Sequence, residues 1–257
     1  MQGLSLAVCH GIDHPDILPM AKEAGFDGFF SDPLFGNQPD TLTQIAKQAG
    51  ELGMRYDNSH ATIPGSELLW ADIPAGENAL ANFFACIDNC VSLGVPMLVV
   101  HCSPEYAPVY SVGIKRMERL VEYAAGKGIQ IAFENTSSEE YLVRTLKHFE
   151  GCSTAGFCYD SGHEAFCTPG ARFLPQLGDR LFYTHFSDNY LDGDHHLLPW
   201  DGKIDFNRII DQLRDTGYKG VLAMEVSYLP YMKELTPMEY VKRCYDRACR
   251  LRQLLQE

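Results

Sequence analysis

The chain alternates short apolar runs with longer segments of helical periodicity, and this alternation occurs eight times. Short runs rich in β-branched and aromatic residues indicate strands, and apolar residues spaced three or four apart indicate helices. The expected strands are Leu4–Cys9, Phe26–Ser31, Arg55–His60, Met97–Cys102, Ile129–Glu134, Ala155–Asp160, Leu181–Phe186 and Val221–Val226. The expected helices, one after each strand, are Pro15–Ala24, Thr41–Leu52, Glu77–Leu93, Val112–Lys127, Tyr141–Phe149, Ala171–Leu177, Phe206–Asp215 and Pro237–Leu255.

This order predicts a parallel (β/α)8 TIM barrel, an α/β fold whose typical length is about 250 residues. No linker rich in Ser, Pro or Gly divides the sequence, so we expect residues 1–257 to form a single domain. A doubly wound open sheet is the alternative, but it usually has fewer strands, and no glycine-rich phosphate loop follows the first expected strand. Five expected helices are followed by a glycine suited to a left-handed cap: Gly25, Gly53, Gly94, Gly128 and Gly217.

The balance of charges weighs against a polyanionic partner. The 21 Lys and Arg residues are outnumbered by 34 Asp and Glu residues, which gives a net charge of −13, so binding of nucleic acid is disfavoured. No apolar run approaches the roughly 18 residues of a membrane span. The first ten residues, MQGLSLAVCH, lack a signal-peptide pattern. We therefore expect a cytoplasmic protein with no membrane partner.

The nine cysteines are odd in number and contain no CxxC pattern. Reduced thiols packed in a core are therefore expected instead of disulfides. Cys86 and Cys90 lie one helical turn apart and could supply half of a metal site. Because no second pair accompanies them, we interpret both as packing residues.

Polar residues end most of the expected strands, where a barrel of this kind carries its catalytic groups. They are His60, His101, Glu134, Asp160 with the nearby His163, His185 with Asp188, and Glu225. A buried carboxylate or imidazole is costly unless a metal, a counter-charge or hydrogen bonds compensate it. Six strands that end this way indicate one shared site. Imidazole and carboxylate ligands without a thiolate pair suit a divalent ion such as Zn, Mn, Co, Fe or Mg.

The loop after the seventh expected strand adds two further candidate ligands. Asp194 and His196 are separated by one residue, so in extended backbone their side chains leave the chain on the same side and can bind one ion. His195 then points elsewhere. His10 stands at the end of the first expected strand without a defined role, and His14 and His148 are expected to be ordinary surface residues.

Several motifs resemble the xylose-isomerase-like TIM-barrel superfamily, and together they span the chain in order. They are FENT with Glu134, FCYDSGH with Asp160 and His163, THFSDN with His185, DHHLLPWDGKIDF with Asp194 and His196, and AMEVS with Glu225. This superfamily includes sugar and sugar phosphate isomerases and epimerases, dehydratases, and AP endonucleases of the endonuclease IV type.

The epimerase branch implies one divalent metal ion held by Glu134, Asp160, His185 and Glu225. Glu134 and Glu225 would also be the acid/base pair that moves a proton through a metal-stabilised enediolate of a small sugar or related polyol or keto compound. Substrate contacts would come from His60, His101 and His163. The chain departs from the epimerases at Leu191, where they carry a substrate-binding arginine, so a simple ketose 3-epimerase is in doubt.

The AP endonuclease branch implies up to three ions and phosphodiester hydrolysis. The first ion would be held by His60, His101 and Glu134. The second would be held by the four ligands named above, and the third by His163, Asp194 and His196. The dehydratases of the superfamily are a further alternative.

The residues outside the ligand set favour a small sugar-like substrate over DNA. The loops that follow the expected strands carry Arg172 and Lys203 but many acidic residues, and a duplex binder needs basic side chains there. Trp70 and Trp200 each lie in a loop containing Pro and Gly, and we expect them to cap the substrate. One ion per chain is expected. Related barrels often pair, so a homo-oligomer is an open alternative to a monomer.

Overall fold

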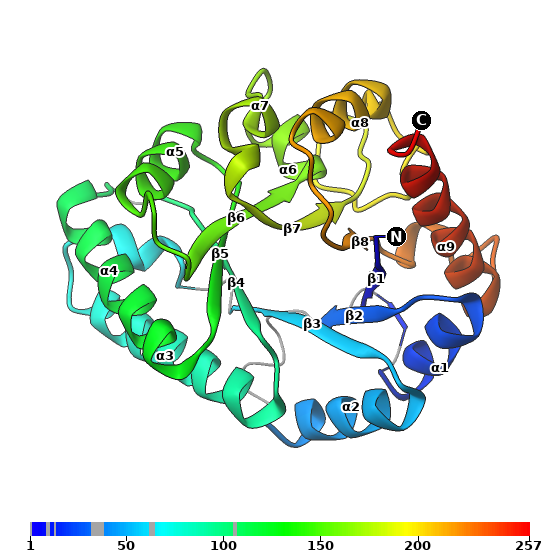
Figure 1. Cartoon of the computed structure of the whole chain (residues 1–257), viewed down its shortest axis with the longest axis horizontal. Coiled ribbons are helices and arrows are strands. Elements are labelled where there is room, and N and C mark those ends of the chain that lie inside the picture. The colour runs from blue at the N-terminus through cyan, green and yellow to red at the C-terminus, as the bar shows by residue number, and fades with distance from the viewer. Residues whose placement is uncertain (1, 9–10, 13, 32–38, 62–64, 105–106) are drawn as a thin grey trace.

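The computed structural model describes residues 2–8, 11–12, 14–31, 39–61, 65–104 and 107–257. Its eight strands pair in parallel with their neighbours in sequence order, and β1 also pairs with β8, which closes the barrel (Figure 1). The strands are β1 (Leu4–Ala7), β2 (Gly28–Ser31), β3 (Arg55–His60), β4 (Met97–His101), β5 (Gln130–Glu134), β6 (Ala155–Asp160), β7 (Leu181–Phe186) and β8 (Leu222–Met224). The predicted TIM barrel is confirmed.

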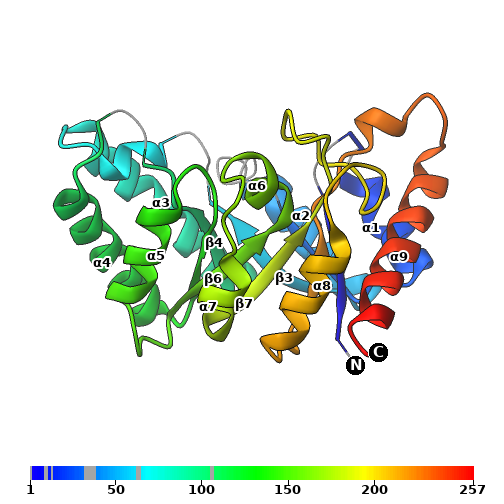
Figure 2. The same cartoon turned by 90° about the horizontal axis from the view of Figure 1, so that it is seen from above.

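A ring of helices surrounds the strands (Figure 1). The α-helices are α1 (His14–Ala24), α2 (Pro39–Leu52), α3 (Ala75–Leu93), α4 (Tyr110–Lys127), α5 (Glu139–His148), α6 (Ser161–Phe166), α7 (Phe173–Leu177), α8 (Phe206–Asp215) and α9 (Pro237–Leu254). The 3-10 helices are η2 (Glu67–Trp70), η3 (Gly178–Arg180) and η4 (Leu229–Tyr231). In the side view, both termini lie at one end of the barrel and α6 lies at the other (Figure 2).

Most predicted elements are present, with two informative differences. The sequence analysis missed α6, whose six residues are too few for a helical period; its start is capped by Asp160, whose Oδ1 accepts the N–H of His163 at 2.5 Å. The last strand is shorter than expected, so Glu225 lies just beyond β8. Cys9 and His10, at the end of the first expected strand, lie outside the described residues. The five predicted cap glycines all have positive φ.

Apolar side chains form two layers. The larger layer lies between the barrel and its helices. The smaller layer fills the barrel interior and consists of Ala7, Phe30, Met97, Val99, Ala132, Cys158, Tyr183 and Ala223. The eight cysteines within the described ranges are free, and Cys86 and Cys90 are buried on α3 as packing residues. Across the same ranges, no helix is both long enough and apolar enough to cross a membrane.

Trp70 contradicts the expectation that it caps the substrate. It belongs to η2 and is fully buried in the core, where its ring packs against Tyr110 and Tyr141. Helix α4 has room for the ring because Gly113 lacks a side chain; a Cβ there would lie 2.1 Å from the Trp70 ring. The loop position that suggested a cap is in fact a 3-10 turn folded onto α3 and α4.

Arg116 on α4 holds the η2 turn in place through hydrogen bonds. Its guanidinium donates to the carbonyl oxygens of Leu69 at 3.0 Å and Ala71 at 2.6 Å, and its Nε donates to Glu77 at 3.0 Å. The side chain is almost completely buried. Arg119, one turn along, also pairs with Glu77 but is exposed to solvent.

These two arginines give a matched test of the packing. Because a buried carbonyl left without its donor costs about 1–3 kcal/mol, Arg116→Met should lower the free energy of unfolding by about 3 kcal/mol in urea titrations. Arg119→Met should change it little, because exposed ion pairs contribute little. Equal effects of the two substitutions would contradict this account of the turn.

Candidate metal centre

The candidate ligands project from one layer of the barrel. Side chains alternate along a strand, so a residue two positions after an inward-facing one also faces the interior. Two positions after the interior residues Val99, Ala132, Cys158, Tyr183 and Ala223 stand, respectively, His101, Glu134, Asp160, His185 and Glu225. The ligands on β4 to β8 therefore form the layer above the apolar interior, at the C-terminal ends of the strands.

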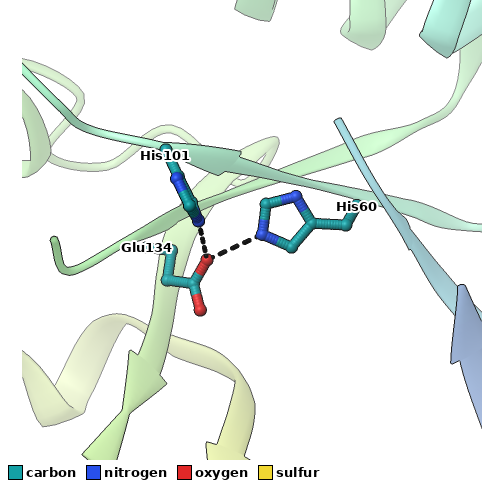
Figure 3. A group of neighbouring side chains, drawn as sticks. All are labelled: His60, His101 and Glu134. Carbon is teal, nitrogen blue, oxygen red and sulfur yellow. Dashed lines mark hydrogen bonds and ion pairs between the residues drawn. The ribbon is translucent and has the colours of Figure 1, made fainter. Parts of the chain in front are cut away.

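Glu134 is the centre of this layer and is completely buried. One carboxylate oxygen, Oε2, lies 2.9 Å from Nε2 of His60 and 3.0 Å from Nε2 of His101 (Figure 3). The other oxygen, Oε1, lies 2.7 Å from Nδ1 of His185. Side chains from β3, β4 and β7 thus converge on a carboxylate from β5.

A second carboxylate contacts the same histidine. Nδ1 of His185 lies 3.3 Å from Oε2 of Glu225. Ligand atoms of Glu134, Asp160, His185 and Glu225 all lie within 4.8 Å of one another, and so do those of His60, His101 and Glu134. The structure therefore brings together the four residues of the expected single-ion site and the three residues of one additional site.

The two glutamates are held in their charged form. Burial raises the pKa of Glu134, but the imidazoles of His185, His101 and His60 outweigh it and lower the pKa well below its usual value. Burial also raises the pKa of Glu225, but the imidazole of His185 outweighs burial, so the pKa is lowered. Asp160 differs, because burial and the neighbouring carboxylates raise its pKa to about 8. The carboxyl groups of Glu134, Asp160 and Glu225 therefore lie together with less positive charge than would keep all three ionised.

His60 and His101, which both contact Oε2 of Glu134, have pKa values shifted in opposite directions. Burial lowers the pKa of both, but His60 also interacts with Glu225 and its pKa is raised, whereas the pKa of His101 is lowered. For His185, Cys158 together with the carboxylates of Glu225 and Glu134 outweighs burial and raises the pKa well above its usual value. Protons on His60 and His185 therefore balance carboxylates of this layer, whereas burial favours the neutral form of His101.

A divalent cation fits this layer. Oδ2 of Asp160 and Oε2 of Glu225 are buried and have no hydrogen-bond partner within the described part of the chain. Buried carboxylate oxygens without donors are unfavourable, and a cation would compensate them. The donor set of carboxylates and one imidazole suits zinc, manganese, cobalt or magnesium.

The third expected triad is linked through Asp194. Its Oδ2 lies 3.3 Å from Nε2 of His163 and 3.2 Å from Nε2 of His196. Burial would lower the pKa of His196, but Asp194 and the carboxylates beyond it raise it to about 10. The three ligand atoms are not among the groups that lie mutually within 4.8 Å. The structure shows a chain of ion pairs that joins the β7–α8 loop to α6.

Asp188 is not a ligand, although it stands at the end of β7; it organises the loop that carries Asp194 and His196. Its carboxylate accepts the backbone N–H groups of Asn189 at 2.8 Å, Gly202 at 2.9 Å and Ile204 at 3.0 Å. Within this loop Leu191, His196 and Trp200 adopt positive φ, a strained conformation for residues with side chains. The buried carboxylate holds the strained loop in place.

The ring of Trp200 contacts the outer helices, and its expected role as a substrate cap stays a prediction. Its ring packs against Phe206 of α8, with centroids 5.1 Å apart, and Arg250 of α9 lies 4.0 Å from the ring centroid. Both contacts belong to the outer helices, and none of its ring contacts within the described residues is a candidate ligand. A tryptophan in this loop serves to dock it on α9.

The remaining histidines agree with expectation where they are described. His195 points toward Asp192 at 3.6 Å, and His148 is an exposed residue that pairs with Glu118 at 2.8 Å. The side chain of His14 lies outside the described part of the chain, as does His10.

Two residues of the site were missed by the sequence analysis. Asn135 donates from Nδ2 to the carbonyl oxygen of Asp160 at 2.8 Å and accepts the N–H of Asp160 at 2.7 Å, which ties the ends of β5 and β6 together. Cys158 has its sulfur within 4.8 Å of ligand atoms of Glu134 and His185. Its place two residues before Asp160 could have indicated an inward-facing side chain.

The role of Asp188 can be tested by hydrogen exchange. Asp188→Asn replaces an acceptor oxygen with an amide that cannot accept, so backbone N–H groups of residues 189–204 should exchange faster in mass spectrometry than in the wild type. Asp192→Asn, an exposed substitution in the same loop, serves as the control and should leave exchange unchanged. Equal protection in both variants would contradict the role assigned to Asp188.

Comparison with known proteins places this barrel in a family. Residues 18–243 match the family described as xylose isomerase-like TIM barrel. The chain therefore belongs to the xylose isomerase-like TIM barrel family. One relative, the uncharacterized protein y4fM of Sinorhizobium fredii, is 28% identical over 95% of this chain and 90% of its own length.

Solved structures share the fold at lower identity. The IOLI protein with a bound zinc atom superimposes with a TM-score of 0.81 at 17% identity, covering 97% of this chain and 98% of its own. D-psicose 3-epimerase, solved in the presence of D-fructose, superimposes with a TM-score of 0.77 at 17% identity over 100% of both chains.

Proposed function

We propose that this protein is a metal-dependent isomerase or epimerase of a small sugar or a related polyol or keto compound. The observation that carries the proposal is the pair of buried carboxylates, Glu134 and Glu225, which lie 2.7 Å and 3.3 Å from the same atom, Nδ1 of His185. Such a pair can act on one substrate carbon from two directions. The named structural neighbours support the substrate class, since one is an epimerase solved in the presence of a ketose.

A divalent ion would be held by Glu134, Asp160, His185 and Glu225. When bound, it would make a C–H bond acidic by polarising the carbonyl and hydroxyl oxygens on either side of it. Zinc is the first metal to test, because the IOLI structure contains zinc; manganese, cobalt and magnesium are the others. We propose one ion per chain.

The chain's own glutamates would move the proton. The lowered pKa values of Glu134 and Glu225 keep both carboxylates ionised at neutral pH, so either can accept a proton from carbon. In epimerisation, the second glutamate takes a proton from water and delivers it to the opposite face of the same carbon, and the first glutamate releases its own proton to water. In isomerisation, the glutamate that accepted the proton returns it to the neighbouring carbon. Which of the two occurs depends on how the substrate lies between the two side chains.

The histidines around the pair would position the substrate. His60 and His101 contact one side of Glu134, and His163 lies 3.8 Å from the other oxygen of the same carboxylate. All three are at most slightly exposed. His163, whose Nδ1 has no hydrogen-bond partner within the described residues, would donate to a substrate hydroxyl group, and His60 and His101 would line the site and exclude bulk water.

A second candidate function is phosphodiester hydrolysis of the AP endonuclease type. One observation favours it: His60, His101 and Glu134 form an additional ligand group beside the first. The basic residues weigh against it, because Arg116 is buried among backbone carbonyls and Arg208 pairs with the buried Glu164 at 2.9 Å. With a net charge of −13, the protein is better suited to a neutral polyol.

Proton transfer to carbon can be measured directly. The zinc- or manganese-loaded wild type, incubated with ketoses in D2O, should incorporate deuterium at the carbon beside the carbonyl, as NMR would show. Because Glu225→Gln removes an acid/base group, it should lower the rate at saturating metal by about 10²–10⁴-fold.

Glu77→Gln, which changes an exposed carboxylate on α3, is the control and should retain the full rate. Undiminished exchange in Glu225→Gln would remove that residue from the mechanism. Efficient nicking of an abasic-site duplex by the wild type, without exchange into any ketose, would favour the hydrolase instead.

A further inference from the structure

His185 is held rigidly, with one edge facing the ligand group. It is completely buried, and its ring stacks on Phe30 with centroids 4.6 Å apart and planes inclined by 11°. Tyr183 packs edge-on at 5.7 Å. Because Nδ1 lies 2.7 Å from Glu134 and 3.3 Å from Glu225, Nε2 lies on the edge of the ring that faces away from them.

The far nitrogen of His185 lacks the hydrogen-bond partner that the second nitrogens of His60 and His196 have. Nδ1 of His60 lies 2.9 Å from the carbonyl oxygen of Ala61, and Nδ1 of His196 lies 2.9 Å from that of Glu225. Nε2 of His185 is buried and has no hydrogen-bond partner that meets ordinary geometry within the described residues. Histidines that bind metals usually donate their second N–H to an acceptor, which fixes the tautomer and the ring orientation.

Cys158 is the candidate acceptor for this nitrogen. It lies on β6, paired in register with Glu134 on β5 and with Tyr183 on β7, and its thiol points into the barrel interior one layer below the ligands. The thiol is completely buried. Its sulfur lies within 4.8 Å of a ring nitrogen of His185, and Nδ1 of that ring is engaged by the two glutamates.

We propose that Cys158 is a positioning residue, whose Sγ accepts the N–H of His185 Nε2 so that the lone pair of Nδ1 faces Glu134, Asp160 and Glu225. Sulfur is a weak acceptor, but a buried N–H with no alternative makes even a weak bond valuable. The inference rests on the proposed metal site. It assigns a function to a thiol that packing alone would otherwise explain.

Metal affinity tests this role without relying on turnover. Zinc affinity would be measured by competition with a chelating dye for the wild type, Cys158→Ala and Cys158→Ser. Loss of an outer hydrogen-bond partner typically weakens metal binding by about 10–100-fold, and we expect Cys158→Ala to do so. Cys158→Ser supplies an oxygen acceptor in a similar volume and should restore affinity close to that of the wild type. Cys244→Ala, which removes an equally buried thiol from α9, should leave affinity unchanged.

Each other result would overturn the inference. Wild-type affinity in Cys158→Ala, or equal weakening in the alanine and serine variants, would show that the thiol does not orient His185. An intense thiolate-to-cobalt charge-transfer band in the Co²⁺-loaded wild type would show direct ligation by sulfur instead. Failure of the proposed function is distinguishable, because it would appear as tight zinc binding that depends on Cys158 but supports no exchange into any ketose.

Discussion

The buried carboxylate of Glu134 is the interaction on which the site depends. It contacts three imidazoles, from His60, His101 and His185, at 2.7–3.0 Å, and within the described residues it belongs to each of the three ligand groups that could hold an ion. A lone ionised carboxylate at this depth would be strongly unfavourable. The three imidazoles therefore compensate the burial of this charge, so the residues of the site also stabilise the fold.

The closed parallel barrel explains how distant residues reach one point. Each of the strands β3 to β7 contributes one residue to the ligand layer, and Glu225 follows β8. The apolar interior layer below the ligands, with Phe30 and Tyr183 as its largest members, excludes water from that side. Loops complete the rim. The carboxylate of Asp188 holds the β7–α8 loop so that Asp194 and His196 lie beside His163. The strands thus position the ligand side chains, and the β7–α8 loop, held by Asp188, covers one side of the ligand layer.

Much of this arrangement could be predicted from the sequence because the same strand-and-helix pattern recurs along the chain. Period-two alternation in strands determines which residues face inward, and the last polar residue of each apolar run is the one at the mouth; this predicts Glu134, Asp160 and His185 without any knowledge of distance. The packing of Trp70 and Trp200 could not be predicted, because the sequence of a loop does not reveal which surface the loop packs against. Trp70 packs on Gly113, and Trp200 docks on Arg250. Cys158 was overlooked because a thiol in an apolar run suits core packing equally well.

The central claim is that Glu134, Asp160, His185 and Glu225 hold one divalent ion. Anomalous diffraction at the zinc edge, from crystals of the zinc-loaded protein, locates that ion directly. The account predicts a single strong peak about 2.0–2.2 Å from carboxylate oxygens of this group and from Nδ1 of His185. A peak bound by His60 and His101 without His185, or no peak in the barrel, would contradict it.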